Sequence, residues 1–165
     1  MTTNLTDLRI ETGTERDVPV ILSLIKALDE YERMAADVVA DEALVHASFF
    51  GQAPSAEVVI ARVGAEPVGF AVWLHNHSTF LGRRGLYLED LFVVPEWRGR
   101  GIGRALLAYL AEVAVKRDCG RMEWSVLDWN EPAIKFYRSL SAKPMNEWTV
   151  FRLTGDDIAR LAGSQ

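Results

Sequence analysis

The chain has 165 residues, of which 49% are hydrophobic and 25% are charged, and its formal net charge is −5. This length suits one domain, and this balance excludes an intrinsically disordered chain, a collagen and a coiled coil. An acidic chain repels phosphate backbones, so we expect no nucleic-acid partner. No segment approaches the roughly 20 apolar residues of a membrane span, so we expect no membrane partner either.

The first part of the chain predicts one short strand and two helices. The strand covers Leu8–Ile10. Thr14-Glu15-Arg16-Asp17 is typical of a capping box, in which the acid reaches back to the free amides of a helix start. Apolar residues then recur at helical spacing, so the first helix is expected to end near Arg33. Ala40–Phe50 predicts a second, shorter helix.

The middle of the chain predicts three strands and a helix. Glu57–Val63 and Val68–His75 are separated by a turn and predict a hairpin, and Gly85–Val94 predicts a third strand. Pro95 cannot continue that strand, and a glycine-rich turn follows it. Ile102–Arg117 then has one apolar side and predicts a helix.

The last part of the chain predicts strands and helices in alternation. We expect a strand at Arg121–Leu127, a helix from Asn130-Glu131-Pro132 to about Leu140, a strand at Glu147–Leu153 and a tail helix at Asp156–Ala162. Strands and helices therefore mix throughout residues 1–165. The pattern predicts a single α/β (α+β) domain with a central sheet and helices on both faces.

Cysteine and histidine usage points to a reducing compartment and to no metal. Cys119 is the only cysteine, so it can form neither an internal disulfide nor a cysteine zinc site. The polar N-terminus lacks the apolar core of a signal peptide. A cytoplasmic location is therefore the expectation. The three histidines lack metal-ligand spacing with acids, so no metal is expected.

The strongest motif is the glycine-rich turn Arg98-Gly99-Arg100-Gly101-Ile102-Gly103-Arg104, which follows a strand and opens a helix. Glycines let a backbone approach a ligand closely, and the first turn of a helix offers free N–H groups and a positive dipole end, so the turn suits a phosphate. The alternative is a tight turn with solvated arginines. The spacing fits neither a Walker A loop nor a dinucleotide fingerprint.

Two adjacent carboxylates, Glu89 and Asp90, interrupt a strand that is otherwise apolar from Leu86 to Val94. Neighbouring strand residues point to opposite faces of a sheet. If both faces are covered, the two acids cannot both face solvent. Each could cap a loop or pair with an arginine. The functional alternative is that at least one of them faces a polar cleft and attracts a cation or moves a proton.

A third pattern, Asn-x-x-Ala-x-x-Phe-Tyr, is formed by Asn130, Ala133, Phe136 and Tyr137. On periodicity alone, Tyr137 is an ordinary helix tyrosine. With Arg-x-x-Gly-x-Gly at 98–103, however, the pattern resembles the GNAT superfamily of N-acetyltransferases. Four further segments resemble the spermidine/spermine (diamine) acetyltransferase branch, and together they extend the resemblance over nearly the whole chain. They are Tyr31-Glu32, Tyr87–Asp90, Trp97–Gly103 and Trp129–Pro132.

The resemblance implies a mixed sheet that splays between its fourth and fifth strands and holds the co-substrate acetyl-CoA there. It implies that strand backbone, loop amides and a helix start bind this molecule. The implied residues are Leu91, Phe92, Val93, Arg98, Gly99, Arg100, Gly101, Ile102, Gly103, Arg104, Asn130, Glu131, Pro132 and Ala133. It also implies a homodimer.

The resemblance further implies direct transfer to a primary amine of a small molecule. Tyr137 would protonate the departing sulfur, and Glu89, ahead of Asp90, would accept the amine proton. The implied acceptor-binding residues are Tyr31, Glu32, Glu89, Asp90, Glu123, Trp124, Ser125 and Trp148.

The acceptor itself stays open between a diamine or polyamine and a thialysine-like amino acid. Arg83 and Arg84 precede the strand that carries the acids, where a polyamine site would favour apolar or acidic residues. Two alternatives to this function stand beside it. One is a non-catalytic module that binds acyl-CoA, and the other is an acetyltransferase that acts on protein lysines or N-terminal amines.

Overall fold

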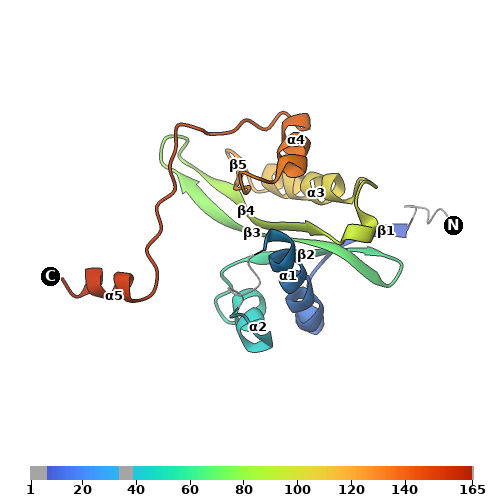
Figure 1. Ribbon diagram of the computed structural model, residues 1–165, viewed down its shortest axis with the longest axis horizontal. Coiled ribbons are helices and arrows are strands. Elements are labelled where there is room, and N and C mark those ends of the chain that lie inside the picture. The colour runs from blue at the N-terminus through green and yellow to red at the C-terminus, as the bar shows by residue number, and fades with distance from the viewer. Residues whose placement is uncertain (1–6, 34–38, 165) are drawn as a thin grey trace. The chain divides into compact units, whose positions relative to one another are not determined.

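The computed structural model describes residues 7–33 and 39–164 of the chain (Figure 1). These residues fall into two compact units, one within Met1–Ser125 and one within Val126–Gln165. The first unit carries the sheet, and the second carries two short helices. The single-domain organisation expected from the sequence stays a prediction.

The first unit is built on a five-stranded sheet in the order β1-β2-β3-β4-β5. Neighbouring strands are antiparallel from β1 to β4, whereas β5 runs parallel to β4. The predicted mixed sheet is therefore confirmed. The strands are β1 (Leu8–Thr12), β2 (Glu57–Val63), β3 (Glu66–Ser78), β4 (Arg83–Val93) and β5 (Met122–Trp124).

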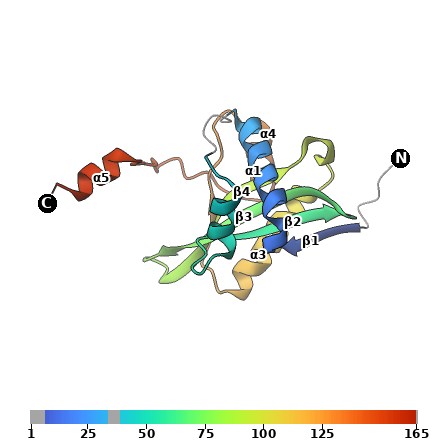
Figure 2. The same ribbon diagram turned by 90° about the horizontal axis from the view of Figure 1, so that it is seen from below.

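Two helices, α1 (Val18–Glu32) and α2 (Glu42–Phe50), lie on one face of this sheet (Figures 1 and 2). Their apolar sides and the facing strand residues form one buried core, as the helical spacing of the apolar residues predicts. The core residues are Val18, Ile21, Leu24, Leu28, Val45, Val58, Ile60, Phe70, Val72 and Phe92.

The helix α3 (Ile102–Lys116) covers the opposite face of the sheet (Figure 1). It buries Ile102, Leu106, Leu107, Leu110 and Ala114. Helices therefore lie on both faces, as predicted. Since α3 begins directly after the glycine-rich turn, its first turn lies near the end of β4.

Polar caps mark the start of the short 3-10 helix Glu15–Asp17, which leads into α1, and the start of α2. Asp17 accepts hydrogen bonds of 2.8 Å from both the backbone N–H and the hydroxyl of Thr14, just before α1. Asp41 accepts the backbone N–H of Leu44 at 2.8 Å at the start of α2. These bonds satisfy groups that helix geometry leaves free, so the predicted cap at Thr14–Asp17 is confirmed.

The second unit contains α4 (Glu131–Ser139) and α5 (Asp156–Ala162), but the strand predicted at Glu147–Leu153 is absent. That prediction was wrong. A strand needs a neighbouring strand to pair with its N–H and C=O groups, and within the described chain no strand pairs with this segment. Its apolar side chains are exposed instead, with Phe151 at 91%.

In the described part of the chain, every helix is too short or too polar to cross a lipid bilayer.

Candidate active site

The strand β4 contains one residue more than the facing part of β3. Leu88 lies opposite Trp73 and Asp90 lies opposite Val72, so Glu89 has no partner of its own on β3. This arrangement is a β-bulge, which bends a strand and turns side chains in new directions. The bulge therefore lies at the pair of acids that the sequence singles out.

The bulge also reverses the direction of the backbone groups along β4. The Leu86 N–H donates a hydrogen bond of 3.0 Å to the backbone oxygen of Arg121, just before β5. The Val94 N–H donates one of 3.0 Å to the backbone oxygen of Val68 on β3. In a regular strand, residues an even number apart point their N–H groups to the same side. The direction of the backbone N–H groups must therefore reverse once between Leu86 and Val94, at the bulge. After this reversal the N–H groups of Leu91 and Val93 point away from β3.

The side of β4 to which these groups point is open. The ladder between β4 and β5 covers only Leu86–Leu88, so no strand of the described chain pairs with this edge beyond Leu88. The predicted opening between the fourth and fifth strands is thus confirmed. Alternation directs the Phe92 backbone toward β3, so the backbone groups of Leu91 and the N–H of Val93 point to the side where an extended ligand arm could pair with them.

Asp90 is a half-buried residue on the α1 face of the sheet, since its partner Val72 lies in the α1 core. Burial, followed by the negative charges of Glu89 and Glu32, raises the pKa of Asp90 to about 6. A carboxyl group with this pKa can both hold and release a proton near neutral pH.

Two acids on α1 join this group. Burial raises the pKa of Glu32, and the charge of Asp29 adds to the rise. One carboxyl oxygen of Asp29 is buried and has no hydrogen-bond partner in the described chain. The last two turns of α1 and the β4 bulge therefore gather negative charge in one place, where a cation would be attracted.

The glycine-rich turn leads from β4 into α3. Gly99 and Gly101 adopt positive φ angles of 72° and 85°, which favour glycine. A Cβ atom at either position would meet nothing within 4 Å, so the space above the turn is open. Among the described residues, no side chain caps the first turn of α3, whose free N–H groups point out of the helix start. These features fit the pyrophosphate of acetyl-CoA.

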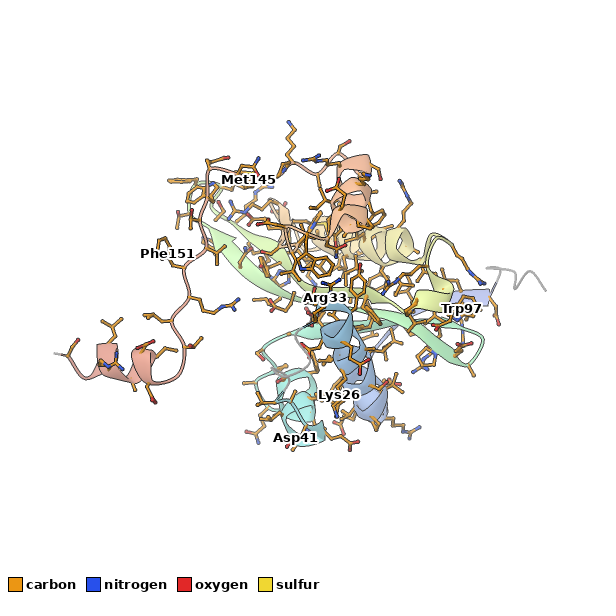
Figure 3. All side chains as sticks on the ribbon, viewed as in Figure 1. Lys26, Arg33, Asp41, Trp97, Met145 and Phe151 are labelled. Carbon is orange, nitrogen blue, oxygen red and sulfur yellow. The ribbon has the colours of Figure 1, made fainter. Side chains whose placement is uncertain are left out.

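The turn is anchored to the sheet at Trp97. This side chain is buried, and its Nε1 donates a hydrogen bond of 3.1 Å to Glu66 on β3. Arg100 lies 4.7 Å from the centre of the Trp97 ring and donates to the backbone oxygen of Glu96 at 3.2 Å. The anchoring fixes the position of the glycines relative to the open edge of β4. Figure 3 labels Trp97 at this end of the sheet.

Arg98 leaves the turn in another direction. Its Nε donates a hydrogen bond of 2.9 Å to the backbone oxygen of Val93. Its guanidinium carbon lies 4.3 Å from the ring centre of Tyr31 and 5.4 Å from that of Phe92. Arg98 therefore joins the open edge of β4 to the last turn of α1.

The predicted acceptor residues of β5 are already engaged with their neighbours. Glu123 forms an ion pair with Arg121, with the two side chains 2.6 Å apart, and accepts a hydrogen bond of 3.2 Å from Asn76. The Ser125 hydroxyl lies 3.2 Å from the Tyr87 hydroxyl. Trp124, between them, is half-buried. An acceptor that uses Glu123 would have to share it with Arg121.

Arg83 and Arg84 belong to another part of β4. They line an open pocket of about 430 Å³ together with His77, Gly82, Arg117 and Asp118, and Arg83 is paired with Asp118 at 3.0 Å. At about 3.3 Å per strand residue, roughly 20 Å of strand separates these arginines from the acids of the bulge. They therefore do not act on the choice of acceptor at Asp90.

The second unit carries the remaining predicted residues. Asn130 caps α4, accepting the Ala133 N–H at 3.4 Å, and Glu131 and Pro132 form its first turn, as expected. Tyr137 lies on α4 next to Phe136, with their ring centres 5.5 Å apart. Trp148 lies in the extended segment and is 71% exposed.

Comparison with known proteins decides the family. The acetyltransferase (GNAT) family model matches residues 23–141, which is more than half of the chain. The chain belongs to the GNAT acetyltransferase family. The resemblance predicted from the glycine-rich turn and the Asn130–Tyr137 pattern is thereby confirmed, and the chain is an N-acetyltransferase.

Two curated relatives show which enzymes this GNAT acetyltransferase is similar to. It is 36% identical over 165 residues to the thialysine N-epsilon-acetyltransferase of Bos taurus, a match that covers 93% of this chain and 96% of the relative. It is 30% identical over 195 residues to the L-ornithine N5-acetyltransferase NATA1 of Arabidopsis thaliana, covering 91% of this chain and 86% of the relative.

A solved structure supports the fold of this acetyltransferase. An integron cassette protein from the mobile metagenome of V. cholerae superposes with a TM-score of 0.81 and 25% identity, covering 96% of this chain and 99% of the other. GNAT acetyltransferases use acetyl-CoA as their co-substrate, and the open edge of β4 and the glycine-rich turn fit it.

Sequence reasoning missed two features of the site. It did not place Asp29 beside Glu32 as part of the acidic group, although helical spacing of three residues was a signal. It also assigned Arg98 to the pyrophosphate without foreseeing its contact with Tyr31, which no local pattern reveals. Among residues 7–33 and 39–164, no three His, Cys, Asp or Glu side chains are grouped so that they could hold a metal ion.

Proposed function

We propose that this acetyltransferase moves an acetyl group directly from acetyl-CoA to the side-chain amine of a small amino acid of the thialysine or ornithine type. The observation that carries the proposal is the half-buried carboxyl group of Asp90, which lies among other acids in the same strand as the open backbone edge at Leu91 and Val93. A proton acceptor and a binding edge for the co-substrate are thus close together.

The proposed binding site for acetyl-CoA uses backbone groups. Leu91 and Val93 would pair with its extended pantetheine arm, the amides of Gly99–Arg104 would hold its pyrophosphate, and Asn130–Ala133 would line the channel for the rest. When bound, acetyl-CoA supplies a thioester carbonyl carbon that a neutral amine nitrogen can attack.

Asp90 is proposed as the group that prepares the amine. An alkylamine has a pKa of about 10.4, so about one molecule in a thousand is neutral at pH 7. The ionised Asp90 carboxylate takes the ammonium proton and passes it to water. Sequence reasoning ranked Glu89 first, but Glu89 is exposed, whereas the raised pKa of Asp90 suits a proton acceptor near neutral pH. Glu89 and Glu32 then attract the cationic acceptor.

Two further groups complete the proposed reaction. As the new C–N bond forms, negative charge grows on the carbonyl oxygen, and an N–H of Leu91 or Val93 can donate to it. As the C–S bond breaks, the Tyr137 hydroxyl gives its proton to the sulfur. The role of Tyr137 rests on the family pattern.

The choice of an amino acid over a polyamine rests on the relatives. The two curated relatives are named for thialysine and for L-ornithine, both amino acids with a side-chain amine. The acidic group at Glu32, Glu89 and Asp90 suits the ammonium end of such a molecule. Tyr31 would form a wall of the same site. The relatives do not favour the non-catalytic alternative.

An amine panel tests the proposal. Purified protein is incubated with acetyl-CoA and, separately, with thialysine, ornithine, lysine, spermidine, spermine and a lysine-containing peptide, and the release of free thiol is followed. We expect the highest kcat/KM with the small amino acids. Turnover only with the peptide, or thiol release that no amine stimulates, would contradict the proposal.

We also propose a homodimer of single-domain subunits in the cytoplasm. The family match runs across the boundary between the two units, which supports one domain. The segment at 148–153 is rich in apolar residues and exposes Trp148, Val150 and Phe151 at 71%, 81% and 91%. Large exposed apolar side chains need a cover, and we assign that cover to a second copy. The single cysteine suits a reducing compartment.

A further inference from the structure

Arg98 touches three groups from two separate elements. Its Nε donates to the backbone oxygen of Val93 at 2.9 Å, and its guanidinium lies 4.3 Å from the Tyr31 ring centre and 5.4 Å from that of Phe92. The Tyr31 and Phe92 rings also meet each other, with centres 6.5 Å apart. Arg98 therefore lies on a small aromatic platform formed by α1 and β4.

The other arginine of the same turn, Arg100, differs in this respect. It donates to Glu96 and lies over Trp97, so these contacts stay within its own loop. Both arginines are cations beside the same glycines. Arg98 is the one that reaches across to α1, which makes Arg100 a matched control.

The platform bears on the acceptor side of the site because Tyr31 is next to Glu32 in the last turn of α1. That turn ends at Arg33, which has a left-handed φ of 61°. The charge of Glu32 contributes to the raised pKa of Asp90. Whatever holds Tyr31 in place thus also fixes the position of Glu32 relative to Asp90.

A guanidinium group suits this task better than an ammonium group. It is planar and weakly hydrated, so it can lie on an aromatic ring while its Nε still donates a hydrogen bond in its own plane. A lysine at position 98 would keep the positive charge but could not make both contacts in the same way. The substitution Arg98→Lys therefore keeps the positive charge at this position and removes the stacking on Tyr31.

We propose that Arg98 is a positioning residue for the acceptor amine: it holds Tyr31 and the last turn of α1 against the open edge of β4, in addition to any contact with the pyrophosphate. The proposal rests on the proposed function, since it assumes that Tyr31 and Glu32 border the acceptor. In this proposal one arginine of the acetyl-CoA loop also positions the residues that bind the acceptor amine.

Steady-state kinetics with both substrates varied tests this link. We expect Arg98→Lys to raise the KM for the preferred amino acid about 2- to 20-fold and to change the KM for acetyl-CoA much less. Arg100→Lys, in the same pyrophosphate loop, should change the KM for acetyl-CoA at least as much as the KM for the acceptor, so its acceptor KM should rise less than that of Arg98→Lys. An Arg98→Lys variant that raises only the KM for acetyl-CoA would overturn the proposal.

Variants of Tyr31 make the test specific. In a Tyr31→Phe background the ring remains, so Arg98→Lys should raise the acceptor KM as much as it does in the wild type. In a Tyr31→Leu background the ring is gone, so Arg98→Lys should have little further effect. Equal effects in both backgrounds would refute the role of stacking, even if Tyr31 itself touches the acceptor.

The controls separate this proposal from the proposed function. Thermal unfolding midpoints and CoA affinity by calorimetry show whether each variant is folded and binds its co-substrate. A wild-type protein that acetylates no amine defeats the proposed function. An active wild type whose acceptor KM is unchanged by the Arg98→Lys substitution defeats the positioning role alone.

Discussion

Asp90 on β4 and Glu32 in the last turn of α1 bring two carboxyl groups together from distant parts of the first unit's sequence. Burial is the main cause that raises the pKa of Asp90 to about 6, and the charges of Glu89 and then Glu32 add to it. Through Glu32, helix α1 thus helps to raise the pKa of a residue in the sheet.

The first prediction concerns the pH dependence of the rate. Because Asp90 must be ionised to accept a proton, kcat/KM should rise as the pH increases through about 6, with a further rise at higher pH as the free amine loses its own proton. Glu32→Gln removes one neighbouring negative charge and should move the lower limb to a lower pH. A lower limb that stays in place in Glu32→Gln would contradict the link between the two acids.

The second prediction concerns Asp90→Asn, which should lower kcat/KM by about 10²-fold or more at pH 8. Glu89→Gln is the matched control, since Glu89 is exposed and lies one residue away. It should have the smaller effect on kcat and act mainly through the acceptor KM. The reverse order of the two effects would return the role of base to Glu89.

The Asp90→Asn substitution should also raise the free energy of unfolding. The pKa of Asp90 is about 6 in the folded chain against a reference of 3.8. Between these values the unfolded chain loses its proton first, so the wild type loses stability as the pH rises, and the loss is complete above about 6. Asp90→Asn should therefore be more stable than the wild type by up to about 3 kcal/mol at pH 8 and by much less at pH 4. Urea unfolding at the two pH values measures this difference.

The third prediction concerns Tyr137, on α4. Tyr137→Phe removes only the hydroxyl, so it should lower kcat by about 10²-fold while the KM for acetyl-CoA changes little. The ring contact with Phe136 remains, and the unfolding midpoint of the variant is measured alongside to show that it is folded. Unchanged kcat would remove Tyr137 from the proposed reaction.

The fourth prediction concerns the glycine-rich turn. Gly101→Ala places a Cβ on a residue with φ of 85°, which costs roughly 1 kcal/mol of strain, although the side chain meets no neighbour. The backbone N–H groups would shift, so the affinity for CoA should fall several-fold in calorimetry. Gly82→Ala has a similar positive φ in open space but lies outside the turn, and it should leave CoA affinity as it was.

The fifth prediction concerns the exposed segment of the second unit. Phe151→Asp introduces a charge in the face assigned to a second copy, so the protein should become monomeric in light scattering at micromolar concentration. Lys143→Glu, outside the apolar run, controls for a general effect of added negative charge. A wild-type protein that is monomeric would refute the dimer at once.

The sequence predicted the elements of the first unit well because their signals are local. Helical spacing, caps and alternation located α1, α2, α3 and the strands within a few residues. The bulge was not foreseen, since it depends on how β4 pairs with β3. Its one trace in the sequence was the pair of adjacent acids Glu89 and Asp90, which a regular strand would not carry.

The other errors have a common physical origin. Glu147–Leu153 has the composition of a strand, but a strand is completed by a neighbour, and the described chain offers none. The contact between Arg98 and Tyr31 joins distant parts of the sequence, so no window of the sequence contains it. Both features depend on partners that lie far away along the chain or outside it.

The bulge at Glu89 is a feature of how the β4 backbone pairs with β3, and the direction of the Leu91 and Val93 amides follows from that pairing. In evolutionary terms, the part of the sheet that receives the common acyl donor can remain constant while the neighbouring side chains diverge. A fold of this kind can acquire a new acceptor through a few substitutions at the bulge and at the end of α1, without having to reinvent how it binds the donor.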